Sequence, residues 1–306
     1  MFKDYYLKVL SSNKVPKFLK KYLKVPSLQR LKGIGYFCGM NYASKDIYNF
    51  KEYITRYDHS LTVALLVYRL TKNKEATISG LFHDIGTPCF SHVIDYMNKD
   101  YDKQESTEKN MFNIIESDSE LLNLLREDKI KVNQIIEFKE FTILDNDRPK
   151  LCADRLDGII QCSYNWTQEL KLEEIDTLIN DICIYKNKNG EDEIGFKTKE
   201  VAERVLNLSN KINEVCHSSE DNYMMELLAK ITRYSINMGY ITYDDLFKFS
   251  EKKMFEKFDS IKDSFIEKLL IDFRTMIPEK IPYVELPNVK SRDINPLVNG
   301  KRLKGE

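Results

Sequence analysis

The 306-residue chain lacks long apolar runs. No stretch reaches the roughly 18 apolar residues that a membrane-spanning helix needs, so we expect no membrane association. The N-terminal segment MFKDYYLKVL lacks the apolar core and small-residue cleavage site of a secretory signal. The six cysteines include no CxxC pair, which indicates reduced thiols. These absences predict a cytoplasmic protein.

An excess of charge of either sign is also missing. Lysine and arginine together number 47 and aspartate and glutamate 48, which gives a formal net charge of −1. A dedicated nucleic-acid binder is usually strongly basic, so we expect no nucleic-acid partner. The lysine-rich segment KVPKFLKKYLK (Lys14–Lys24) is best interpreted as a solvated amphipathic helix.

Apolar residues at helical spacing dominate what is present. HSLTVALLVYRL places Val63, Leu66 and Leu70 on the same helical face as His59. One segment, DICIYKNKNGEDEIGFKT, has two β-prone arms around an Asn-Gly turn and predicts a hairpin. Three further prolines follow Pro278 and indicate an extended tail. The chain is therefore predicted to be all-α, with one small β-hairpin and an extended C-terminal arm.

Histidine is scarce, yet three of the four histidines lie between residues 59 and 92. His59 begins one predicted helix, and His83 and Asp84 end the next. Asp154 lies in the apolar segment CADRLDGII, where a carboxylate needs a partner. Each histidine alone would more often be a core residue. Together, two imidazoles and two carboxylates suit one divalent transition metal (Mn, Fe, Co, Ni or Zn) and leave coordination positions for water and substrate.

The order of these residues resembles the HD-domain metal-dependent phosphohydrolases. LQRLKGIG, RYDHSLTVA, GLFHDIGTPCFSHVID, DRLD and the tail segment VKSRDINPLV are similar to the deoxynucleotide triphosphohydrolase branch of that family. The resemblance implies one unit over residues 1–306, with an HD core at about 25–165 and the hairpin and C-terminal helices at about 181–306. It implies hydrolysis of a nucleotide or another phosphate-containing small molecule. Relatives in this branch often form homo-oligomers, although the sequence has no obvious self-complementary patch.

Residue roles follow from the same resemblance. The four metal ligands would be the two histidines and two aspartates described above. His92 and Asp95 match a pair that serves the chemistry, and their i, i+3 spacing puts both on one helical face. Aspartate there would hold the imidazole in one tautomer. The substrate-binding candidates are Arg56, Arg155, Gln29 and Glu105.

Several positions depart from the branch. Thr87 stands where many relatives have a histidine or an asparagine. Gln104 stands where relatives often have a histidine, which leaves open a second interpretation: a degenerate HD protein that binds metal and nucleotide as a sensor without turnover. Gly158 and Cys162 replace a tyrosine and an aspartate that read the sugar in relatives. Neither offers a strong hydrogen-bonding group, so we expect poor discrimination between ribose and deoxyribose. A triphosphohydrolase, a nucleotidase and a phosphodiesterase all remain open.

Overall fold

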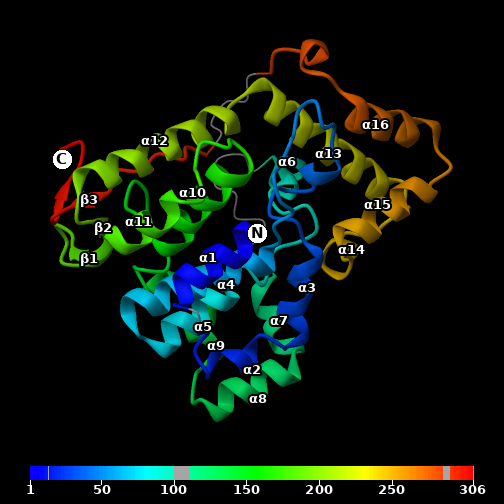
Figure 1. Cartoon of the computed structure of the whole chain (residues 1–306). Coiled ribbons are helices and arrows are strands. Elements are labelled where there is room, and N and C mark those ends of the chain that lie inside the picture. The colour runs from blue at the N-terminus through cyan, green and yellow to red at the C-terminus, as the bar shows by residue number, and fades with distance from the viewer. Residues whose placement is uncertain (13, 100–109, 285–289, 306) are drawn as a thin grey trace.

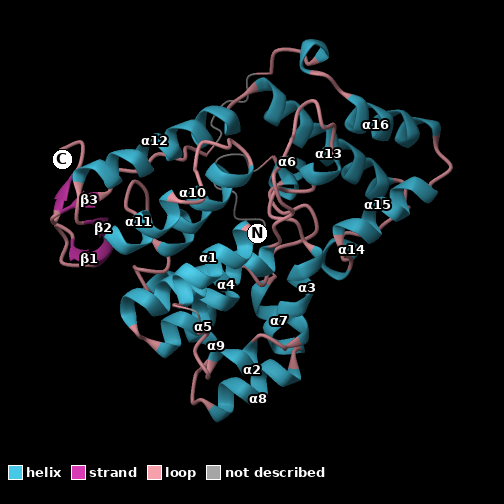
Figure 2. Ribbon diagram, viewed as in Figure 1, coloured by secondary structure: helices cyan, strands magenta, loops and turns pink. Residues whose placement is uncertain are grey.

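The computed structural model describes residues 1–12, 14–99, 110–284 and 290–305 (Figure 1). This described part contains sixteen α-helices and four short strands, and the strands lie together in one small sheet (Figure 2). The mainly helical class predicted from the sequence is confirmed, and so is the hairpin after Asp181.

Helix α4 (Arg56–Thr71) holds the first metal-ligand candidate and packs mainly against three other helices. These are α1 (Phe2–Ser11), α5 (Lys74–Phe82) and α10 (Ala153–Asn165). Every residue of α4 from His59 to Val67 is buried, which fits a helix covered on several sides.

A capping box fixes where α4 begins. The Thr55 hydroxyl accepts the Asp58 N–H at 3.2 Å, and the Asp58 carboxylate accepts the Thr55 N–H at 2.9 Å. Two of the N–H groups left unpaired at a helix start are thereby satisfied. His59 consequently enters the protein interior in the first turn, at a defined rotation about the helix axis.

The other N-terminal elements are short. Helix α5 ends at Phe82, so that His83 and Asp84 lie in the turn immediately after it. The remaining helices of this part are α2 (Leu19–Tyr22), α3 (Pro26–Arg30), α6 (Val93–Asn98), α7 (Met111–Ser117), α8 (Ser119–Glu127) and α9 (Val132–Ile136), with 3-10 turns η1 (Leu31–Gly33), η2 (Met40–Tyr42) and η3 (Phe138–Glu140).

Long helices make up the C-terminal half. Helix α12 (Lys199–Cys216) packs against α10, and α13 (Ser219–Asn237) packs against α6 and α16 (Ser264–Thr275). The other helices are α11 (Glu174–Asp181), α14 (Asp245–Lys248) and α15 (Glu251–Ser260), and η4 (Pro278–Lys280) follows α16. Buried apolar residues from Phe2 to Ile294 form one contiguous core.

The sheet joins the predicted hairpin to the C-terminal arm. Strands β1 (Ile182–Lys186) and β2 (Asp192–Phe196) pair antiparallel, and β3 (Leu297–Val298) pairs parallel to β2 and antiparallel to β4 (Lys301–Arg302). The approach of β3 requires a glycine, because a Cβ atom on Gly195 would lie 2.6 Å from the Leu297 carbonyl oxygen. The arm is thus extended, as predicted, and it also completes the sheet.

Polar contacts anchor the same arm. The Arg302 guanidinium pairs with the fully buried Glu193 carboxylate, with Nη2 at 2.9 Å from Oε2. Asn295 N–H donates to the Pro149 carbonyl at 2.8 Å, and Ser209 Oγ donates to the Arg292 carbonyl at 2.9 Å. The arm therefore has a defined path beside α12.

No helix in the described ranges combines the length and apolar character needed to cross a bilayer.

We expect Arg302→Ala to loosen the arm, because it leaves the Glu193 carboxylate buried without its cationic partner. Losing one member of a buried ion pair costs about 3 kcal/mol or more. Urea denaturation would measure the loss, and hydrogen exchange would detect faster exchange in the arm. Lys186→Ala is the control, since its exposed pair with Asp192 lies in the same sheet and should contribute under about 1 kcal/mol. Equal stabilities of the two variants would contradict this assignment.

Candidate metal centre

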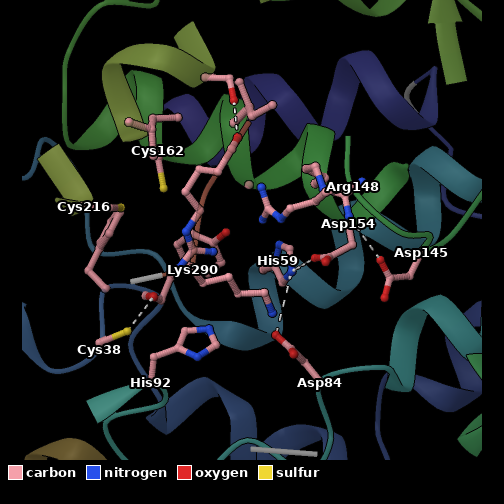
Figure 3. A pocket seen from close by; sticks show the side chains of 18 of the residues that line it. Cys38, His59, Asp84, His92, Asp145, Arg148, Asp154, Cys162, Cys216 and Lys290 are labelled. Atoms are coloured by element: carbon pink, nitrogen blue, oxygen red, sulfur yellow. Dashed lines mark hydrogen bonds and ion pairs between the residues drawn. The ribbon is translucent and has the colours of Figure 1, made fainter. Parts of the chain in front are cut away.

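A cavity of about 720 Å³ opens among α4, α10, α12, α13 and the C-terminal arm. The segments after α5 and before α10 complete its wall. All four predicted metal ligands line it, together with His92 and Arg56. Figure 3 shows the side chains of His59, Asp84 and Asp154 from different segments meeting at one side of this cavity. The tertiary fold therefore brings together residues that lie far apart in the sequence.

Both buried histidines are oriented by a hydrogen bond at Nδ1. His59 Nδ1 lies 2.7 Å from Oδ2 of Asp157, and His83 Nδ1 lies 2.8 Å from the Gly80 carbonyl oxygen. A carbonyl or carboxylate oxygen can only accept, so each Nδ1 carries the proton. Each Nε2 then faces the cluster and can bind a metal once its own proton has left, which is the orientation of metal-binding imidazoles.

The two Nε2 atoms converge on Asp154. Asp154 Oδ1 lies 3.0 Å from Nε2 of His59 and 3.4 Å from Nε2 of His83. One ligand atom from each of the three residues falls within 4.8 Å of the others. Nε2 of His83 is buried and makes no hydrogen bond to any described residue. A buried polar atom without a partner is costly, and a metal bound there would satisfy it.

Asp84 lies beside this cluster. Its carboxylate oxygens are 3.8 Å from Nε2 of His59 and 3.9 Å from Nε2 of His83. Nη1 of Arg56 donates to Asp84 Oδ2 at 2.9 Å and holds the carboxylate in place. His59, His83 and Asp154 are thus close enough to hold one divalent cation, and Asp84 lies just outside this group, where its predicted role as the fourth ligand stays a prediction.

The charges of the cluster depend strongly on one another. Burial alone would lower the pKa of His59, but its contacts with Asp154 and Asp157 outweigh burial and raise that pKa to about 10. Burial opposes charge on Asp84 too, yet Arg56 and the histidines hold the pKa of this carboxyl well below its usual range. The carboxylates are therefore charged at neutral pH, and a metal must displace the His59 proton to bind.

His92 and Asp95 form the pair expected from their spacing. Nδ1 of His92 lies 2.8 Å from Oδ2 of Asp95, whose side chain is fully buried. The His92 ring is partly exposed and turned toward the cavity (Figure 3). Burial lowers the pKa of His92 despite the favourable contact with Asp95, so the imidazole is neutral at pH 7 with Nε2 able to accept a proton.

The four substrate-binding candidates have different surroundings. Arg56 lines the cavity but is committed to Asp84, and it stacks on the Tyr36 ring at 4.9 Å. Gln29 does not line the cavity, because its amide donates to the Leu23 carbonyl. Glu105, like Gln104, lies outside the described residues.

Arg155 reaches the cavity wall, but its guanidinium holds the protein's own backbone. Nη2 donates to the Asn146 carbonyl at 2.7 Å, Nη1 donates to the Asn146 side chain at 2.9 Å, and Nη1 also contacts the Lys150 carbonyl. Arg155 thus fixes the segment before α10. Its predicted contact with a phosphate would compete with these bonds.

Sequence reasoning gave no role to several residues that the fold brings to the site. Asp157 lies in the DRLD segment, three residues after Asp154, and that spacing on a helix could have suggested a shared face. Arg148, Lys290 and Arg292 also line the cavity. Their positions depend on long-range packing, for which the sequence carries no local signal.

Gly158 and Cys162 do line the cavity, as their place on α10 predicts. A Cβ atom at Gly158 would lie 2.9 Å from the Tyr36 hydroxyl. Tyr36 therefore occupies space that a side chain at position 158 would need, and its ring also contacts the His59 ring at 4.9 Å. Thr87 is buried away from the cavity lining, and its carbonyl accepts from Arg30 at 2.8 Å.

We expect Asp157→Ala to weaken metal binding about 10–100-fold, because His59 loses the partner that orients it. Asp157→Asn keeps a hydrogen-bond acceptor and should give a smaller loss. Competition with a chelator would measure the affinities of the purified variants for Mn²⁺. Asp176→Ala, on the exposed face of α11, is the charge-matched control. Unchanged affinity in Asp157→Ala would remove Asp157 from the centre.

Comparison with known proteins gives an independent view of this region. Residues 56–176 match the HD domain family, and this range contains the His59, His83 and Asp154 cluster. The chain is 28% identical to the uncharacterised protein YdhJ of Bacillus subtilis, over 75% of this chain and 67% of that protein. It is 24% identical to the metal-dependent phosphohydrolase cns2 of Cordyceps militaris, over 42% of this chain and 36% of that protein.

Neither relative's name refers to deoxynucleotide triphosphates, so that branch stays a prediction. Residues 56–176 are thus similar to an HD domain, and one of the two relatives is named a metal-dependent phosphohydrolase.

Proposed function

We propose that this chain hydrolyses a phosphate ester or anhydride of a nucleotide or related small molecule, using one divalent metal held by His59, His83, Asp84 and Asp154. The observation that carries the proposal is the convergence of two imidazole Nε2 atoms on the Asp154 carboxylate. Each imidazole is oriented by a hydrogen bond at Nδ1, and Nε2 of His83 is buried without a hydrogen bond to the described residues. A metal bound there would satisfy that atom.

A divalent metal bound here would polarise a phosphoryl oxygen and lower the pKa of an attacking water. The chain's own residues supply the rest. Arg56 keeps the Asp84 carboxylate charged and correctly placed. His92 accepts a proton at Nε2, while Asp95 holds its Nδ1–H and stabilises the imidazolium that forms.

The remainder of the cavity favours a ligand larger than orthophosphate. Aromatic side chains line it beyond the metal centre, including Phe37, Tyr48 and Trp166. Such rings suit a flat apolar group such as a nucleobase. The volume of about 720 Å³ lies within the range of small-molecule sites.

A turnover assay with added Mn²⁺ tests the proposal over a panel of ribo- and deoxyribonucleoside mono-, di- and triphosphates and bis(p-nitrophenyl) phosphate. We expect hydrolysis that EDTA abolishes and Mn²⁺ restores. Asp154→Ala should lose both metal and activity, since it removes a charged ligand. Nucleotide binding without turnover anywhere on the panel would instead support the sensor interpretation.

We expect His92→Ala to lower kcat about 10²–10⁴-fold while the metal content stays unchanged, because a general acid–base group is lost but no ligand is. His217→Ala is the matched control, since that histidine does not line the cavity. Metal analysis and steady-state kinetics on the best panel substrate provide the measurements. Loss of metal from His92→Ala would make His92 a ligand, and an unchanged kcat would exclude it from proton transfer.

A further inference from the structure

The turn after α5, residues 83–87, carries two of the predicted metal ligands, and we call it the ligand turn. It lies between α5 and α6, outside any helix or strand. Two backbone hydrogen bonds close it: Ile85 N–H donates to the Phe82 carbonyl at 2.9 Å, and Thr87 N–H donates to the Asp84 carbonyl at 3.0 Å. A turn with so few internal bonds depends for its shape on contacts from other parts of the chain.

Arg30, the last residue of α3, supplies such a contact. Its Nη2 donates to the Ile85 carbonyl at 2.7 Å and to the Thr87 carbonyl at 2.8 Å. Both bonds come from one charged nitrogen, and the two carbonyls flank Gly86. A donor shared by carbonyls two residues apart fixes the course of the backbone between them.

Arg30 is costly to bury. Its Nε and Nη1 are buried and make no hydrogen bond among the described residues. Burial lowers the pKa of Arg30 to about 10, so the side chain is still charged at neutral pH. Desolvation of the charge and of the two unpaired donors offsets what the bonds to the carbonyls contribute to folding. We therefore expect Arg30 to contribute little to overall stability and to act locally, on the ligand turn.

A second arginine holds the same region in a different way. Nη1 of Arg56 donates to Asp84 Oδ2 at 2.9 Å, and its Nε donates to Ser91 Oγ at 3.2 Å. Arg56 thus fixes a ligand side chain from within the cavity. Arg30 lies outside the cavity lining and bonds only to backbone, so it can affect the metal centre only through the path of the turn.

We propose that Arg30 is a positioning residue of the metal centre, which holds the ligand turn so that His83 and Asp84 face the rest of the cluster. The inference rests on the proposed function for the presence of a metal, and it adds a residue that touches neither metal nor substrate. Residues that orient ligands from outside typically contribute about 10–100-fold to metal affinity. Removal of Arg30 should therefore weaken metal binding without unfolding the chain.

Competition with a chelator measures the Mn²⁺ affinity of the full chain after EDTA treatment and desalting. We expect Arg30→Met, which keeps most of the side-chain volume but has no donor, to bind Mn²⁺ about 10–100-fold more weakly. The urea midpoint of the metal-free variant should stay close to that of the wild type, because the desolvation cost of the cation is removed as well. Hydrogen exchange should become faster at the Ile85 and Thr87 amides but not in α4.

Two further variants make the result specific. In Arg30→Lys one ammonium group can still donate to both carbonyls, since both existing bonds come from a single nitrogen, so its affinity should stay near that of the wild type. Arg233→Met is the matched control, because Nη2 of Arg233 also donates to two backbone carbonyls, those of Tyr96 at 3.3 Å and Met97 at 3.1 Å. Its Mn²⁺ affinity should equal that of the wild type.

A measurement on the wild type needs no variant. If the order of the ligand turn and metal binding are linked, each must favour the other. Added Mn²⁺ should therefore slow hydrogen exchange at the Ile85 and Thr87 amides. This comparison tests the role of the turn even if Arg30→Met does not fold.

Several outcomes would overturn the positioning role. One is unchanged Mn²⁺ affinity in folded Arg30→Met, and another is a ligand turn in the wild type that Mn²⁺ does not protect. Equal losses of affinity and urea midpoint in Arg30→Met and Arg233→Met would make Arg30 a structural residue only. A wild type that binds no Mn²⁺ would refute the role and the proposed function together. Arg30-dependent Mn²⁺ binding without hydrolysis of any panel substrate would leave the role standing and refute only the proposed catalysis.

Discussion

The hydrogen bond between Asp157 and His59 is the contact on which the centre depends. The bond links Nδ1 of His59 on α4 to the Asp157 carboxylate on α10. The same bond that joins these two packed helices therefore leaves Nε2 of His59 as the ring nitrogen that faces the metal centre. The Asp157 side chain is fully buried, and few arrangements other than this pairing would satisfy its charge. Metal binding at His59 Nε2 therefore depends on the packing of α10 against α4, because that packing keeps a proton on His59 Nδ1.

Local sequence signals were enough to find the centre but not its surroundings. His59, His83 and Asp154 stand out because polar residues in apolar helical segments need partners, and the fold does bring these three together. The hairpin was equally visible, since an Asn-Gly turn between β-prone arms is a short-range signal. The signal for each ligand candidate lies within about one helical turn of it, and the signal for the hairpin lies within the hairpin itself.

Long-range contacts were not visible in this way. The parallel pairing of Gly195 with Leu297 joins segments whose contact has no periodic signature in either strand. Arg155 was expected to hold phosphate because it stands where the resembled branch has a basic residue, yet Asn146 and Lys150 supply carbonyls that the sequence could not place. Arg148 lies between these two carbonyl contacts and lines the cavity, although no local signal in the sequence placed it there.

The docking of the arm also has a consequence for how the molecule is assembled. Contacts between distant parts of a chain form late, because a long loop must close before they can stabilise anything. His59 and Asp154 are 95 residues apart in the chain, and the pairing of Gly195 with Leu297 spans a similar separation, so both contacts close a long loop. We therefore expect the metal ligands to come together late in folding, at about the same stage as the arm docks onto the hairpin.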